Sequence, residues 1–200
     1  MATLPDTLIV LFDGFDDLDA IGPLEVLTEA GFPVSLGAAP GAPGHVRSAH
    51  GLHIAVPEID SRAPELAVIP GGGWFSGAGV RDQIQRSLPT RIAEWHAAGT
   101  VVGSVCTGAM LLAAAGLMAG RPAVTNRNAI QDLAQAGAEV HAEARVVDDG
   151  SVVTSGGPSA GLDFAIHLVS RFAGVGAGEQ AAERLEHVPV GPVIVTRAPA

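Results

Sequence analysis

The sequence has a single cysteine and few positive charges among its 200 residues. One cysteine excludes an internal disulfide and fits a reducing compartment, so we expect a cytoplasmic protein. The 11 Lys and Arg against 21 Asp and Glu give a net charge of −10, which argues against a nucleic-acid partner. The acidic residues are spread along the chain, which indicates solubility and no specific acidic tail.

Targeting and membrane signals are also missing from the sequence. No basic start precedes an apolar stretch at residues 1–6, so we expect no signal peptide. Residues 96–120 carry no charge and are long enough to cross a bilayer. Their glycine, serine and threonine content fits a buried strand followed by a buried helix better, so we expect no membrane partner.

Buried strands alternate with helices along most of the chain. The expected strands are 7–12, 33–36, two within 44–56, 66–69, 100–105, a strand and hairpin over 140–147 and 152–154. The expected helices are 18–30, 80–97 with an interruption near Pro89, 107–117, 129–136, 158–173 and 179–187. This alternation predicts an α/β fold with a mostly parallel sheet covered on both faces. We expect one domain over residues 1–188 and a loosely held, Pro-rich tail over 189–200.

Residues suited to chemistry or tight turns follow four of the predicted strands. They lie at 13–19, 71–73, 106–107 and 155–157. Ligands gather at the C-terminal ends of parallel strands, so we expect these segments, Gly157 included, to meet at one edge of the sheet.

Cys106 stands where a predicted strand turns directly into a predicted helix. A strand-to-helix elbow exposes its central side chain, and the positive end of a helix favours a thiolate. The amide of Thr107 would then be free to hold a developing anion. The alternative is that Cys106 is a small buried hydrophobe, as most free cysteines are.

Asp19 is the best proton partner for such a thiol. The residue after the cysteine is Thr107, so no adjacent histidine is available, and no histidine spacing indicates a metal site. Asp19 has apolar neighbours, which raises the pKa of a carboxyl and suits it to proton transfer near neutrality. The alternative for the aspartates at 13–19 is turn chemistry and helix capping.

The triplet Gly71, Gly72 and Gly73 follows a buried strand. Glycine amides can point at an anion, so an oxyanion hole is one interpretation and a tight turn is the other. Neither P-loop nor dinucleotide-binding spacing is present, so we expect no nucleotide cofactor.

Five motifs, taken together, resemble the ThiJ/PfpI superfamily. They are Leu18-Asp19-Ala20-Ile21-Gly22-Pro23, Ile69-Pro70-Gly71-Gly72, Ser104-Val105-Cys106-Thr107-Gly108, Ala114-Ala115-Gly116-Leu117 with Gly120-Arg121, and Gly156-Gly157-Pro158-Ser159-Ala160-Gly161-Leu162-Asp163-Phe164-Ala165. They run in order from about residue 7 to 174 and are most similar to the isocyanide (isonitrile) hydratase branch. Sensor domains of AraC-type regulators share the same signatures.

The resemblance implies a flavodoxin-like three-layer sandwich, related to class I glutamine amidotransferases, that forms a homodimer and needs no metal or organic cofactor. It implies that Cys106 is the nucleophile, that Asp19 is the acid beside it, and that Thr107 is the neighbouring hydroxyl. It also implies that Gly72 and Thr107 are the backbone donors. The protease-like branch carries a histidine directly after the cysteine, and its absence here disfavours peptidase and deglycase activity.

One segment departs from the hydratase branch, which reads Thr-His-Trp where this chain has Thr125-Asn126-Arg127. We expect Asn126 to be a substrate-binding residue. Arg127 either favours an anionic substrate or is a surface charge at a helix start.

The expected function is hydration of an isocyanide, a small molecule, to an N-formamide through a thioimidate on Cys106. Three alternatives stay open: a ligand-sensing domain like those of AraC-type regulators, a thiol stress or redox protein, and a hydrolase or glyoxal-type enzyme acting on a small amide or carbonyl.

Overall fold

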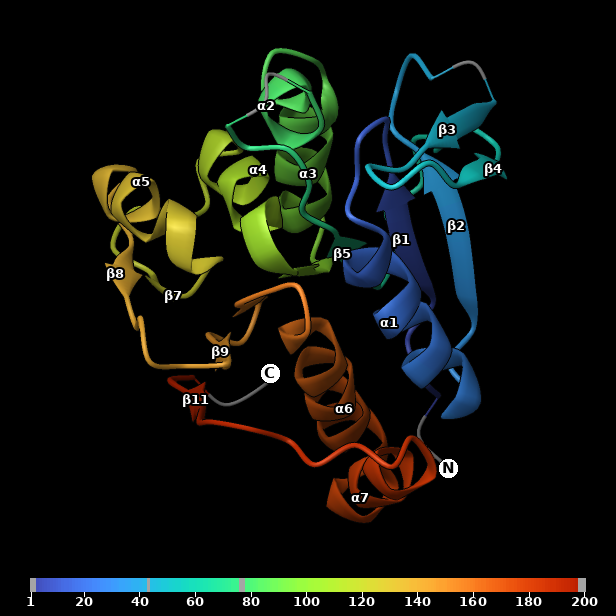
Figure 1. Ribbon diagram of the computed structural model, residues 1–200, viewed down its shortest axis with the longest axis vertical. Coiled ribbons are helices and arrows are strands. Elements are labelled where there is room, and N and C mark those ends of the chain that lie inside the picture. Colours follow the sequence, from blue (N-terminus) through green and yellow to red (C-terminus); the bar gives the residue numbers. More distant parts are fainter. Residues whose placement is uncertain (1–2, 43, 76–77, 198–200) are drawn as a thin grey trace.

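The computed structural model describes residues 3–42, 44–75 and 78–197, and its centre is a seven-stranded sheet between two layers of helices (Figure 1). The strands are β1 (Thr7–Leu11), β2 (Val34–Ala38), β3 (His45–Arg47), β4 (His53–Ala55), β5 (Leu66–Ile69), β6 (Val101–Ser104), β7 (Pro122–Ala123), β8 (Glu139–Val140), β9 (Val146–Asp148), β10 (Val152–Ser155) and β11 (Val193–Val195). The helices are α1 (Asp17–Glu29), α2 (Val80–Gln83), α3 (Leu88–Ala97), α4 (Ala109–Ala114), α5 (Ile130–Gln135), α6 (Ala160–Ala173) and α7 (Val175–Arg184), with 3₁₀ turns η1 (Cys106–Gly108) and η2 (Arg127–Ala129). The flavodoxin-like α/β sandwich predicted from the sequence is confirmed.

The strand order of the sheet is β11-β9-β10-β6-β5-β1-β2. Five of these strands are parallel, while β9 and β11 run in the opposite direction. Helices α1, α6 and α7 pack together on one face, and α2 to α5 lie on the other (Figure 1). The strands β1, β5 and β6 are apolar and almost completely buried because helices cover both of their faces.

Most predicted elements form, including the expected interruption near Pro89 and the two short strands within 44–56. The predicted helix over 80–97 is divided into α2 and α3, because Pro89 stands at the start of the second helix, where its missing amide hydrogen costs nothing. The two short strands expected within 44–56 pair only with each other, as the separate hairpin β3–β4. The short pair β7–β8 includes a strand, β7, that the sequence does not predict.

The expectation of a loosely held end after residue 189 is wrong for β11, which pairs with β9 at the edge of the sheet. The buried carboxylate of Asp163 fastens the segment before β11. It accepts hydrogen bonds from the Arg145 guanidinium (2.9 Å), the His187 ring (3.0 Å) and the Val190 amide (3.3 Å). These partners lie far from Asp163 in sequence, so composition alone does not reveal the attachment.

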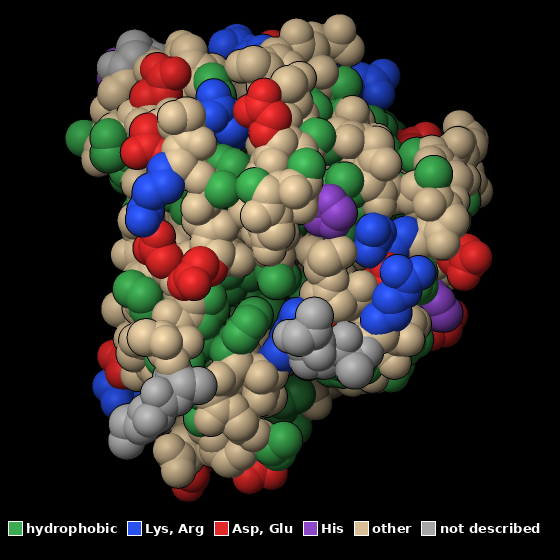
Figure 2. Space-filling view, turned by 180° about the vertical axis from the view of Figure 1, so that it is seen from behind, with side chains coloured by type: hydrophobic (Ala, Val, Ile, Leu, Met, Phe, Trp, Pro, Cys, Tyr) green, Lys and Arg blue, Asp and Glu red, His purple; other side chains and the backbone are tan. Residues whose placement is uncertain are grey.

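The acidic residues, which are spread along the sequence, are also spread over the face of the molecule that Figure 2 shows. On this face, acidic and basic side chains are interspersed (Figure 2). Among the residues that the structure describes, no helix is both long and apolar enough to span a bilayer.

Replacing Asp163 by alanine is expected to destabilise the fold by about 3 kcal/mol, because it leaves the half-buried Arg145 guanidinium without its partner. Urea unfolding measures the loss, and limited proteolysis should cut the released C-terminal segment. The control is Asp82→Ala, which removes a more exposed ion pair with Arg86 and should cost below about 1 kcal/mol. Equal losses in the two variants would contradict the attachment.

Candidate active site

The site begins at the elbow where β6 leads through Val105 into η1. Cys106 has a φ of 56°, in the left-handed region that few residues other than glycine adopt. Two hydrogen bonds hold this backbone in place: the Cys106 amide donates to Gly156 O (2.9 Å), and Thr125 Oγ1 donates to Cys106 O (2.8 Å). Strained backbone of this kind persists only where its surroundings impose it, and it is common at active sites. The elbow predicted from the sequence is therefore present.

Asp19 lies in the first turn of α1 and is completely buried. Its Oδ2 accepts a hydrogen bond from the Gly71 amide (3.0 Å), and its Oδ1 has no hydrogen-bond partner among the described residues. Burial raises the pKa of Asp19 to about 8, the charge of Asp16 adds to the rise, and hydrogen bonding with Gly71 and Cys106 opposes it. Burial therefore favours the protonated form of Asp19 near neutral pH, and its hydrogen bonding with Cys106 sets it beside the thiol.

The Cys106 side chain is also buried, with only 7% of the residue exposed. Burial raises the pKa of its thiol to about 12, and the Asp19 charge adds to the rise. The Thr107 amide and the Asn126 side chain oppose this shift by hydrogen bonding to the sulfur. The helix start favours the thiolate through the Thr107 amide, as expected, but desolvation outweighs this effect and the pKa of the thiol is raised. Burial therefore raises the pKa of both groups and favours the uncharged form of each.

The backbone amides predicted to face a developing anion have two kinds of partner: the sulfur of Cys106, or other protein groups of the site. The Thr107 amide faces the sulfur. The Gly72 amide donates to Thr107 Oγ1 (3.0 Å), and that hydroxyl donates back to Gly72 O (2.8 Å). The Gly71 amide is engaged by Asp19, and Gly73 lies further along the loop, where its carbonyl accepts from the Arg81 amide (3.1 Å). The Gly71 and Gly72 amides therefore position Asp19 and Thr107, and they do not face the sulfur as free donors.

Two glycines are required by close packing at the site. A Cβ on Gly71 would lie 2.7 Å from Asp19 Oδ2 and equally close to the amide and hydroxyl of Thr107. A Cβ on Gly157 would lie 2.2 Å from the Cβ of Cys106 and 2.8 Å from its sulfur. Any side chain at either position would displace the acid or the thiol.

Asn126 also reaches the sulfur. Its Nδ2 lies 3.3 Å from Cys106 Sγ as a hydrogen-bond donor, while its Oδ1 accepts from the Asn128 amide (3.0 Å) and caps η2. Capping fixes the orientation of the amide group, so the nitrogen is presented to the thiol. Arg127, the next residue, is exposed.

Sequence reasoning missed three contributors to the site. Thr125 and Gly156 hold the backbone of Cys106, and the charge of Asp16 raises the pKa of Asp19. The aspartate was visible in the acidic stretch at 13–19, but its effect on Asp19 depends on burial. No group of three or more His, Cys, Asp or Glu side chains within the described ranges is arranged to hold a metal ion.

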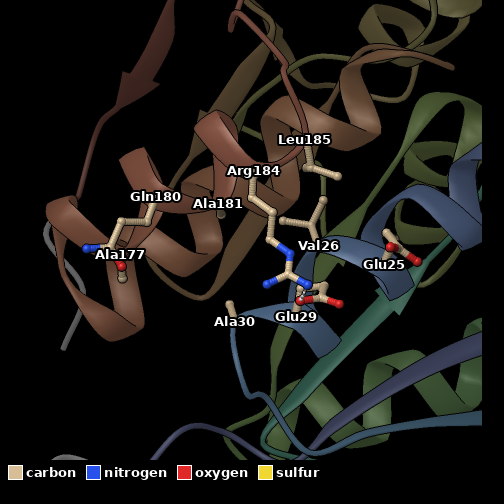
Figure 3. Close-up of a pocket in the computed structure, with 9 residues that line it drawn as sticks. All are labelled: Glu25, Val26, Glu29, Ala30, Ala177, Gln180, Ala181, Arg184 and Leu185. Atoms are coloured by element: carbon tan, nitrogen blue, oxygen red, sulfur yellow. Dashed lines mark ion pairs between the residues drawn. The ribbon is translucent and has the colours of Figure 1, made fainter.

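A concave region lies between α1 and α7, with a volume of about 340 Å³ (Figure 3). An ion pair between Arg184 and Glu29 (2.7 Å) bridges the two helices there. The lining residues are Glu25, Val26, Glu29, Ala30, Ala177, Gln180, Ala181, Arg184 and Leu185. None of them is a predicted site residue, so we assign the chemistry to the elbow.

Comparison with known proteins now decides the family. A model of the DJ-1/PfpI family matches residues 6–171, which is most of the chain. The chain belongs to the DJ-1/PfpI family. The ThiJ/PfpI resemblance seen in the motifs is thereby confirmed.

Individual relatives differ in activity. Isonitrile hydratase of Pseudomonas putida is 35% identical over 193 residues, which cover 92% of this chain and 78% of that protein. A deglycase of Thermococcus kodakarensis is 32% identical over 155 residues, covering 76% of this chain and 89% of the relative. The solved structure of a ThiJ/PfpI family protein from Pseudomonas syringae superposes with a TM-score of 0.80 at 27% identity, covering 94% of this chain and 77% of that one. The family therefore includes enzymes, and its members catalyse different reactions.

Replacing Asn126 by leucine, which has a similar size, is expected to slow alkylation of Cys106 by iodoacetamide roughly five- to tenfold at about pH 9. The Asn126 donor lowers the pKa of the thiol, so its loss reduces the thiolate fraction. Asn128→Leu is the matched control, because that exposed side chain is not bonded to the sulfur. An unchanged rate in Asn126→Leu would show that the amide does not act on the sulfur.

Proposed function

We propose that this protein is a cysteine-dependent hydratase that converts an isocyanide and water into an N-formamide. The observation that carries the proposal is the burial of a carboxyl and a thiol in one site, where Gly71 packs on Asp19 and Gly157 packs on Cys106. Burial raises the pKa of both groups. The similarity to an isonitrile hydratase over most of the chain supports the same reaction. The substrate is a small molecule, and we propose that the enzyme acts as a homodimer in the cytoplasm.

The first half-reaction needs the two groups that the site provides. The terminal carbon of an isocyanide carries a lone pair and becomes electrophilic once it is protonated. Asp19 donates its proton to that carbon, and the sulfur of Cys106 then bonds to the same atom while the thiol proton passes to the Asp19 carboxylate. The product is a neutral thioimidate, and Asp19 is protonated again. Because no step requires a stable thiolate, the raised pKa of Cys106 is compatible with this chemistry.

The second half-reaction adds water to the C=N bond of the thioimidate. The carbon gains a hydroxyl group and the nitrogen gains a proton, with Asp19 giving one proton and taking another from the water. The hydroxyl proton then returns through Asp19 to the sulfur as the carbon–sulfur bond breaks. This releases the formamide and restores both protonated groups. Thr107 Oγ1 anchors the Gly72 backbone beside this proton path.

The burial of the thiol favours a small reacting group. Only a small part of Cys106 is exposed, so a bulky reacting centre would have little access to the sulfur. An isocyano group is linear and one atom wide at its reactive end. Burial and the raised pKa of the thiol also disfavour a redox-sensor role, which needs an accessible thiolate.

Cys106→Ser and Asp19→Asn are each expected to lower formamide production from an aryl isocyanide by roughly 10³-fold or more, because both groups act as one unit. Formamide is quantified by NMR or chromatography, and circular dichroism confirms the fold of each variant. Asp13→Asn is the control. Asp13 is an exposed acid in the loop between β1 and α1, and its Oδ1 accepts a hydrogen bond from the Arg47 amide of the hairpin β3–β4. Comparable turnover by wild type and Cys106→Ser would remove the thiol from the mechanism.

The rate of isocyanide hydration is expected to be constant at lower pH and to fall as pH rises through about 8, where Asp19 loses its proton. In Asp16→Asn the fall should begin at lower pH, because the negative charge that raises the pKa of Asp19 is gone. Asparagine preserves the cap that Asp16 provides to the Leu18 amide, so the helix is retained. A rate that increases through this range would instead identify the Asp19 carboxylate as a base.

A further inference from the structure

The hairpin β3–β4 lies along the segment that carries the site acid. Figure 1 shows it beside the C-terminal ends of β1 and β2, separate from the central sheet. Its backbone is tied to the loop after β1 by bonds from the Gly14 amide to Arg47 O (2.8 Å) and from the Ala49 amide to Phe15 O (2.8 Å). The hairpin therefore follows this loop up to the beginning of α1.

The side chain of Asp17 completes this attachment. Its Oδ1 accepts from Ser48 Oγ (2.6 Å), and its Oδ2 accepts from the His50 amide (3.2 Å) and pairs with His50 Nδ1 (2.7 Å). Asp17 is the first residue of α1, and Asp19 follows two residues later in the same turn. The loop at the tip of the hairpin thus holds the turn from which the acid projects.

The opposite side of the same turn contacts the glycine loop. The Asp16 amide donates to Gly71 O (2.9 Å), and the Gly71 amide donates to Asp19 Oδ2 (3.0 Å). The turn is therefore held between Gly71 on its inner side and the hairpin tip on its outer side. Two contacts from opposite sides fix its position more closely than the inner contact could alone.

We propose that His50 and Ser48 are positioning residues, which hold Asp19 at the Cys106 thiol by clamping Asp17 from outside the site. The kinetic effect expected of the clamp rests on the proposed function, in which Asp19 is the proton donor. A misplaced proton donor slows the chemical step. Neither residue touches the reacting atoms. The clamp explains why the polar loop of a hairpin that is not part of the central sheet is fixed at this helix start.

The charges at the clamp make it an ionic contact. Hydrogen bonding to Asp17 raises the pKa of His50, and the charges of Asp17 and Asp16 add to the rise. Partial burial acts to raise the pKa of Asp17, but hydrogen bonds from Ser48 and His50 outweigh it and lower that pKa. Charge therefore strengthens the contact when the His50 ring is protonated.

The kinetic test compares two exposed histidines of the same hairpin. His50→Ala is expected to lower kcat for isocyanide hydration about tenfold with little change in KM, whereas His53→Ala should leave both unchanged. His50→Asn should keep most of the wild-type kcat, because its amide nitrogen takes the place of Nδ1. His50→Gln should not, because its amide nitrogen lies one bond further from the backbone. Equal kinetics in His50→Ala and His53→Ala would overturn the clamp.

A second measurement does not depend on the substrate. Cys106 is the only cysteine, so its alkylation by iodoacetamide reports how well the site is closed. A loosened α1 start should uncover the thiol and raise the alkylation rate several-fold in His50→Ala, but not in His53→Ala. If that difference is seen while no variant hydrates isocyanides, the proposed function fails and the clamp stands. If the alkylation rates of His50→Ala and His53→Ala are equal, the proposed clamp is wrong. If His50→Ala does not fold, Asp17→Asn tests the same contact in its place.

Discussion

The contact between the buried Asp19 carboxyl and the buried Cys106 thiol is the constraint around which this structure is arranged. A charge on either group would carry a large desolvation cost in surroundings shielded from solvent, so burial raises the pKa of both. That condition is met only if backbone approaches both side chains closely enough to exclude solvent. Gly71 and Gly157 allow this approach, because a side chain on either would occupy the space of the acid or the sulfur.

The order of strands in the sheet makes this contact possible. The neighbours β10, β6, β5 and β1 are parallel, so their C-terminal ends lie at one edge. Each end supplies one component: Gly156 and Gly157 after β10, Cys106 after β6, Gly71 after β5, and Asp19 in the helix after β1. The strained φ of Cys106 is maintained by partners from two neighbouring segments, so the backbone conformation at the elbow depends on tertiary contacts as well as on the local strand–helix sequence.

This convergence was predictable from the sequence because fully apolar strands alternate with helices, and parallel strands bring their ends together. What could not be predicted depends on burial and on distant pairing. The direction of the Cys106 pKa shift is set by desolvation, which a helix-start argument ignores. The Gly72 amide is occupied by a hydroxyl 35 positions away. The strand β11 pairs with β9 at the edge of the sheet, and Asp163 holds the segment before it. None of these contacts leaves a periodic or compositional signal.

Asn126 clarifies how such a site manages protons. Where the hydratase branch has a histidine, this chain presents an amide nitrogen to the sulfur, held by the cap of η2. An amide donates a hydrogen bond but does not titrate, so it stabilises charge on sulfur without adding a second acid or base. In the proposed hydration mechanism, proton transfer is then left to Asp19, whose pKa is raised by burial and by the charge of Asp16. Asn126 thus keeps a polar group beside the thiol, and in that mechanism the acid–base chemistry falls to a single buried carboxyl.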